Sequence, residues 1–299
     1  MKIKTKLFTL LCLISCYAAF GQDNDNLFSR LQGISNSGVD FYNVDGIEIT
    51  TQQIEVEFTP KNISKKFKQL KIKTSELISA DSTLGFDNYY VFKTTEEPKG
   101  VTNNFSYYFI QSNDKKIVGF SFASINKTDK ELERKFVRLI KDNAIPKSIF
   151  NSLQIDSINF VGRKIPLGGS CRWMGVNNVQ CHFYGQMNWS VHKSFDDATQ
   201  TVNNQFTSIK NRKGGKIVAD TLVIVVFEGT ETKANKIIYD FTGARSALVG
   251  MSGGKTLTIY FIASPVRNNF VSCVMSFWNN DQINPSGLPP LLEQVMHLK

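Results

Sequence analysis

The chain has 299 residues, of which 41% are hydrophobic, 12% aromatic and 20% charged. This composition is typical of a globular protein and excludes disordered and collagen-like chains. Five cysteines are too few for a disulfide-dense miniprotein, and the length allows two domains of ~100–200 residues each.

Residues 1–21 resemble a bacterial secretory signal peptide. Three lysines precede a short apolar run over 7–20, and Ala19 and Gly21 place small residues at −3 and −1 of a cut before Gln22. The apolar run is shorter than the ~20 residues that span a membrane. We therefore predict an exported protein, periplasmic or extracellular, which does not have nucleic acid as its partner.

The same segment offers a second route of processing. Leu13-Ile14-Ser15-Cys16 resembles a lipobox, in which Cys16 would be acylated and tie the protein to a membrane. The small residues at the end of the apolar run favour the cut after Gly21, and both products remain open. Loss of residues 1–21 lowers the net charge from +9 to +6, which mainly aids solubility and could also favour an anionic polysaccharide or an acidic protein.

The first half of the remaining chain alternates strand and helix patterns. Asp45-Gly46 predicts a hairpin turn between strands near 41–44 and 47–50. An amphipathic helix follows Pro60. Strands are expected at 106–110 and 117–122, and apolar residues at helical spacing predict a helix over 132–140.

The second half repeats this alternation of strand and helix patterns. An aromatic-rich hairpin is expected over 171–189, and Ser194 with Asp197 three residues later predicts the N-cap of a helix. Strands follow at 222–227, 237–241, 258–262 and 270–277, with a turn over 264–269 between the last two. Leu291, Leu292, Val295 and Met296 are expected to form a closing helix.

These patterns predict an α+β protein of two similar modules, residues 22–150 and 151–299, each an antiparallel sheet packed with helices. Tyr-Phe-Ile recurs at 108–110 and 260–262 at the same place in each half, which suggests a tandem duplication.

The order of these elements resembles the PsbP-like and DcrB-like α/β sandwich. The resemblance covers each half in outline and depends on Tyr42 to Ile47 and Tyr260 to Met296, and the aromatic hairpin before the second helix departs from it. It implies small, non-catalytic binding or assembly proteins that are exported across a membrane. Some bacterial relatives look like toxin-neutralising proteins.

The sequence offers no strong catalytic or metal motif. His182 and His192 with a carboxylate could hold zinc, but no paired zinc-ligand spacing accompanies them. Gly250 to Gly254 fits neither a serine-hydrolase elbow nor a phosphate loop, since it leads into a strand. Glu228 and Glu231 are expected to be solvated. No cofactor, metal or catalytic residue is therefore predicted.

The aromatic hairpin is the best candidate for a binding surface. Tryptophan, tyrosine and arginine are enriched where proteins bind partners, and tryptophan also stacks on sugars. The predicted partner-binding residues are Arg172, Trp173, Tyr184 and Trp189. Core packing of these aromatic residues is the alternative. A disulfide between Cys171 and Cys181 across the hairpin is an open expectation in an oxidising compartment, and Cys273 reads as a buried thiol.

The sequence thus predicts a non-catalytic binding protein of the bacterial cell envelope that recognises a protein partner. A glycan is the alternative ligand. A secreted enzyme acting on polysaccharide or peptide, and a toxin-neutralising protein of the immunity type, are the alternative functions. Membrane association is expected only if Cys16 is acylated.

Overall fold

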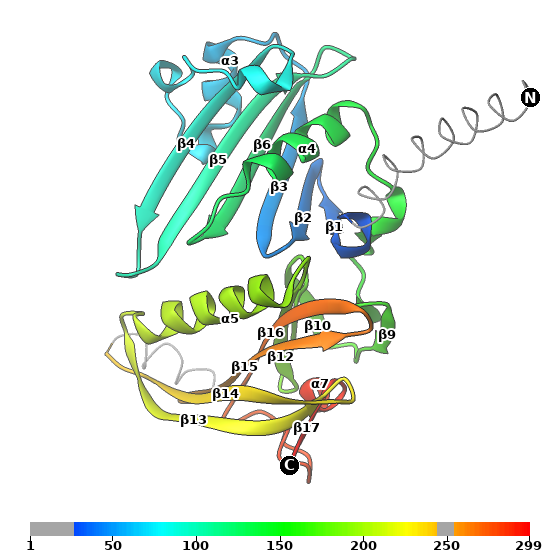
Figure 1. Ribbon diagram of the computed structural model, residues 1–299, viewed down its shortest axis with the longest axis vertical. Coiled ribbons are helices and arrows are strands. Elements are labelled where there is room, and N and C mark those ends of the chain that lie inside the picture. Colours follow the sequence, from blue (N-terminus) through cyan, green and yellow to red (C-terminus); the bar gives the residue numbers. More distant parts are fainter. Residues whose placement is uncertain (1–26, 244–253) are drawn as a thin grey trace, which may run out of the picture.

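The computed structural model describes residues 27–243 and 254–299, and it has an α+β fold of two large sheets with few helices (Figure 1). The predicted fold class is confirmed. The predicted signal peptide, Cys16 and most of the Gly250 to Gly254 run lie outside the described residues. Within the described ranges, no helix is long and apolar enough to cross a membrane.

The first sheet has seven strands in the order β4-β5-β6-β3-β2-β1-β7. All neighbours are antiparallel except β1 and β7. Asp45 and Gly46 turn the β2–β3 hairpin with φ of 52° and 74°, as the sequence predicts. The strands are β1 (Gln32–Asn36), β2 (Val39–Val44), β3 (Ile47–Ile54), β4 (Asn88–Glu96), β5 (Thr102–Gln111), β6 (Ile117–Ile125) and β7 (Phe150–Asn151).

Successive side chains of a strand point to opposite faces, and this sheet has a hydrophobic cluster on each face. Helices cover both faces. On one face, Phe136 of α4 (Lys130–Lys141) packs against Tyr42. On the other, Phe67 at the C-cap of α3 (Pro60–Lys66) packs against Phe109. Four short 3-10 helices complete this half: η1 (Lys68–Leu70), η2 (Thr74–Glu76), η3 (Ser82–Leu84) and η4 (Lys147–Ile149).

The second sheet has eight antiparallel strands in the order β10-β11-β12-β16-β15-β14-β13-β17, and β8 and β9 pair separately. The strand β15 continues to Val266, so the turn predicted over 264–269 is only Arg267 and Asn268. The strands are β8 (Ser157–Phe160), β9 (Arg163–Pro166), β10 (Cys171–Gly175), β11 (Asn178–Cys181), β12 (Gly185–His192), β13 (Gly215–Phe227), β14 (Thr230–Phe241), β15 (Thr256–Val266), β16 (Asn269–Trp278) and β17 (Met296–Leu298).

In the part of the chain that the structure describes, two helices pack on this sheet. The Ser194 hydroxyl caps α5 (Phe195–Lys210) by accepting the Asp197 backbone N–H at 3.1 Å, which confirms the predicted start. The closing helix α7 (Pro290–Glu293) is shorter than predicted. The prediction of helix through Met296 is wrong, because Met296–Leu298 pairs with β13 as strand β17 and pairing requires an extended backbone.

The two sheets share a strand order. The run β4-β5-β6-β3-β2-β1 of the first corresponds to β14-β15-β16-β12-β11-β10 of the second. The helix after β3 or β12 covers one face, and the helix after β6 or β16 adjoins the core of the opposite face. The tandem duplication and its module boundaries stay predictions.

The two sheets meet at the β2–β3 turn, with α5 lying between them (Figure 1). The Asp45 carboxylate, 5% exposed, pairs with Arg30 at 2.9 Å and accepts the Lys193 backbone N–H at 2.9 Å. The Asp45 backbone N–H donates to the Val191 carbonyl at 3.1 Å. This turn of the first half is therefore bonded to the end of β12 in the second.

Candidate binding groove between the two sheets

A groove runs along the junction of the two sheets and comprises two adjacent cavities that share the lining residues Asn43, Glu48 and Asn188. We call them the polar part and the apolar part. The polar part is lined mainly by amide and hydroxyl side chains: Asn43, Asn103, Ser124, Asn188, Ser190, Thr201, Asn204 and Gln205. The apolar part adds the exposed side chains of Phe41, Leu153 and Met174 and the half-buried side chains of Trp173 and Val176.

Strand alternation directs Glu48 into the groove. Ile47 and Ile49 on either side of it are 2% and 1% exposed and belong to the core of the first sheet. Glu48 therefore points to the opposite face, where it lies across from Asn43 of β2 and Ala123 of β6 in the strand register.

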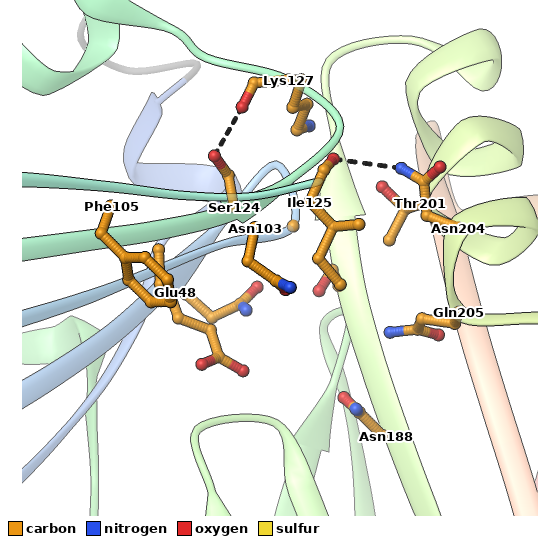
Figure 2. Close-up of a pocket in the computed structure, with 14 residues that line it drawn as sticks. Glu48, Asn103, Phe105, Ser124, Ile125, Lys127, Asn188, Thr201, Asn204 and Gln205 are labelled. Atoms are coloured by element: carbon orange, nitrogen blue, oxygen red, sulfur yellow. Dashed lines mark hydrogen bonds between the residues drawn. The ribbon is translucent and has the colours of Figure 1, made fainter. Parts of the chain in front are cut away.

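The helix α5 forms the opposite wall of the polar part. The Asn204 amide donates to the Ile125 carbonyl at 3.1 Å and accepts from the Asn126 amide at 2.9 Å. Figure 2 shows Asn204 and Gln205 on α5 across from Glu48 and Phe105 of the first sheet. Both halves of the chain thus supply side chains to the polar part.

The charge in the groove is uneven. Glu48 and Lys127 are its charged lining residues. The Lys127 ammonium donates to the Asp45 carbonyl and is well apart from Glu48 in Figure 2. No described residue forms an ion pair with Glu48, and burial among the groove walls raises its pKa although the side chain is accessible to solvent.

The apolar part gathers side chains from three distant segments. Phe41, Leu153 and Met174 are 39%, 51% and 52% exposed and come from β2, the loop after β7 and β10. Trp173 joins these segments, since its indole N–H donates to the Ser152 carbonyl at 3.0 Å. Exposed apolar side chains grouped in a concavity are typical of a binding surface.

The four residues predicted to bind a partner do not form one surface. Trp173 lines the apolar part, but Arg172 is exposed on another side of the hairpin and donates to the Gln180 side chain at 3.1 Å. Tyr184 is half-buried and packs against the core near α7. Trp189 is 1% exposed and packs against Phe160, so its assignment to partner contact is wrong.

The disulfide between Cys171 and Cys181 is present, and the two residues lie directly opposite each other in the β10–β11 register. This confirms the expectation. A structural disulfide is typical of an oxidising compartment and therefore fits an exported protein. Cys273 is fully buried with a free thiol, and burial raises its pKa beyond the range of a reactive cysteine.

The two candidate zinc ligands lie at opposite ends of β12. His182 is exposed before the strand begins, while His192 is 1% exposed at its end. The His192 Nε2 lies 2.8 Å from the Ser272 hydroxyl, and burial together with Lys127 lowers its pKa to about 3. In the described ranges, no three side chains of the ligand types histidine, cysteine, aspartate and glutamate are grouped for a metal.

The expectation that Glu228 is solvated is wrong. Its carboxylate is 3% exposed and lies between Arg163 and Arg267. Arg267 also donates to the Phe160 and Val161 carbonyls. This cluster joins the β8–β9 pair to the second sheet, because its members come from both.

Sequence reasoning missed the residues that define the groove. Glu48, Asn188 and Leu153 belong to ordinary polar or mixed stretches, and nothing local distinguishes them. The alternation of polar and apolar residues around Glu48 could have shown that it points outward. It could not have shown that β12 and α5 lie opposite.

No protein-family model matches the chain, and no curated protein matches it. A search of solved structures found the immunity protein TplEi of T6SS from Pseudomonas aeruginosa, with 8% identity, 90% of this chain and 97% of that chain covered and a TM-score of 0.24. A chain of the Tle4-Tli4 complex shares 8% identity over 90% of this chain and 98% of its own, with a TM-score of 0.24.

A third similar structure is the di-domain ARO/CYC StfQ from the steffimycin biosynthetic pathway, with 11% identity. That alignment covers 89% of this chain and 77% of the other, with a TM-score of 0.17. At these TM-scores the similarity carries no functional argument.

Proposed function

We propose that this chain is an exported, non-catalytic protein that binds a protein partner through the groove between its two sheets. The observation that carries the proposal is the apolar part, where Phe41, Leu153 and Met174 remain exposed side by side in a concavity. Aromatic and methionine side chains are enriched at protein interfaces, and a partially enclosed apolar site holds the anchor residues of a partner.

The lining of the groove favours binding over turnover. Acid–base catalysis by paired carboxylates needs two of them, and nucleophilic catalysis by serine needs a base within hydrogen-bond reach. Among the described residues, the groove lining has one carboxylate, Glu48, and the serines Ser124 and Ser190 have no histidine among their lining neighbours. Amide side chains, which dominate the polar part, suit hydrogen bonds to a peptide backbone.

Export is part of the proposal. The signal-peptide pattern of residues 1–21 and the disulfide between Cys171 and Cys181 support a destination in the periplasm or outside the cell. Acylation at Cys16 would hold the protein at a membrane. Intact-mass measurement of protein purified from the native envelope distinguishes the two forms.

A photo-crosslinking side chain placed in the groove tests the proposed function. We expect p-benzoylphenylalanine at Met174, and separately at Leu153, to give an adduct with the same protein in native envelopes. The control position is Ile78, which is 83% exposed and belongs to neither part of the groove. The adduct should be absent there and should be lost from the position-174 protein when Leu153→Ser is added.

Two results would contradict the proposal. One is equal crosslinking at positions 78 and 174. The other is binding of a glycan array that is lost in Trp173→Ala while no protein adduct forms, which would make a glycan the ligand. If the partner is a toxin, as the immunity-type alternative requires, purification should give a stoichiometric one-to-one complex.

A further inference from the structure

Glu48 is the carboxylate among the described residues that line the groove. It belongs to both the polar and the apolar part, so a chain segment anchored near Leu153 and Met174 passes next to its carboxylate. Among the described residues it has no ion-pair partner. The groove therefore presents a single negative charge beside its apolar anchor site.

Within residues 27–243 and 254–299, no side chain supplies a cation to this carboxylate. Of the described residues that line either part, Lys127 is the basic one, and its ammonium donates to the Asp45 carbonyl at the junction of the sheets. The neighbouring Asn43, Asn103 and Asn188 side chains are neutral. The groove walls partly desolvate Glu48 and so raise its pKa, although its side chain remains exposed to solvent.

A ligand that fills the groove must cover Glu48 and remove water from it. Burying an ionised carboxylate without a partner is strongly unfavourable, whereas a charge-assisted hydrogen bond to lysine or arginine offsets that desolvation. A partner with an apolar or acidic side chain at this position would leave the carboxylate unpaired or repelled. Glu48 thus discriminates between partners by the charge that they bring to it.

We infer that the partner segment entering the groove carries a lysine or arginine side chain that pairs with the Glu48 carboxylate, next to an apolar side chain held by Leu153 and Met174. The inference rests on the proposed function, since it specifies the chemistry of that same partner. The pairing has two independent determinants, one apolar and one ionic, and they can be removed separately.

Selection from a random 12-residue peptide library displayed on phage tests this inference. We expect peptides selected on the wild-type protein to be enriched in lysine or arginine near a large apolar residue. Selection on Glu48→Gln should keep the apolar residue and lose the basic one, and selection on Glu48→Lys should enrich aspartate or glutamate. A selected peptide should bind Glu48→Gln about tenfold more weakly or worse, and Glu131→Gln as well as the wild type.

The outcomes separate this inference from the proposed function. If the Leu153→Ser/Met174→Ser variant selects the same peptides as the wild type, the groove is not the binding site and the proposed function fails. If that variant loses the peptides but Glu48→Gln and Glu48→Lys select the wild-type composition, only the ionic pairing fails. Failure to enrich any peptide, together with glycan binding that depends on Glu48, would overturn the inference in favour of a carbohydrate.

Discussion

The two sheets have the same order over six strands. They differ in the helix that follows β3 in the first sheet and β12 in the second. In the first sheet α3 has 7 residues and covers only its own sheet. In the second, α5 has 16 residues and extends between the sheets, where Asn204 bonds to Ile125 and Asn126. A longer helix at one of two corresponding positions thus supplies a wall of the groove.

The β2–β3 hairpin of the first sheet and the β10–β11 hairpin of the second, which do not hold corresponding places in the strand order, also differ in what they do. The Asp45-Gly46 turn of the first half lies close against β12. A Cβ added to Gly46 would lie 3.1 Å from the His192 ring. The β10–β11 hairpin of the second half is instead closed by a disulfide and brings Trp173 and Met174 to the apolar part. One hairpin therefore joins the two sheets and the other contributes to the binding surface.

The largest effect is expected at the junction. Asp45→Ala removes a buried carboxylate that pairs with Arg30 and accepts the Lys193 backbone N–H. Breaking a buried ion pair typically costs about 3–5 kcal/mol, so the free energy of unfolding measured in urea should fall by that amount. Asp114→Ala, which removes an exposed ion pair with Lys116, is the control and should leave the urea midpoint unchanged. A small effect of Asp45→Ala would mean that the turn does not hold the sheets together.

The next effect concerns pH. His192 ends β12, whereas the corresponding end of β3 is Ile54. Since the folded-state pKa of about 3 lies below the ordinary 6.5, only the unfolded chain takes up a proton between these values. The contribution of His192 to the free energy of unfolding is therefore fully present above pH 6.5. It decreases by about 1.4 kcal/mol per pH unit as the pH falls towards 3.

Urea unfolding at pH 7 and pH 5 measures this contribution. The groups that face His192 and affect its pKa are Lys127, Asp197 and Arg30. We expect His192→Gln to lose less stability between the two pH values than the wild type does. An identical loss in both proteins would show that His192 does not contribute.

The smallest expected effect is the loss of stability when the N-cap residue of α5 or of α3 is replaced. Ser194→Ala removes the N-cap of α5. Thr59→Ala removes the N-cap of α3, because the Thr59 hydroxyl accepts the Asn62 backbone N–H at 3.3 Å. Each should cost about 1 kcal/mol in urea unfolding. Only Ser194→Ala should also weaken groove binding, because α5 lines the groove and α3 does not. Equal weakening by Thr59→Ala would contradict this assignment of the two helices.

The groove also differs in charge from the molecule as a whole. The net charge of the chain is +9, which taken alone would suggest an acidic partner. The groove lining instead contains one unpaired carboxylate and one lysine bonded to a carbonyl. Overall charge acts over long range on the approach of a partner, while the groove acts at contact, so the two can favour different chemistry.

Local sequence patterns determined much of the fold. The Asp45-Gly46 turn, the Ser194 cap, the helix through Phe136 and the pairing of Cys171 with Cys181 depend on residues close in the chain. Local preferences of backbone and side chains are sufficient for such features. The closing helix was overestimated at Met296, because pairing with the distant β13 overrides a local helical pattern.

The tertiary structure alone decided what lies in the groove. It buried Trp189, exposed Met174 and set Glu48 of the first half facing Asn188 and Gln205 of the second. No local pattern encodes such a juxtaposition, since residues more than 100 positions apart meet only through the packing of whole sheets. The sequence by itself therefore determined the strands, turns and helix starts, and long-range packing determined which side chains a partner can reach.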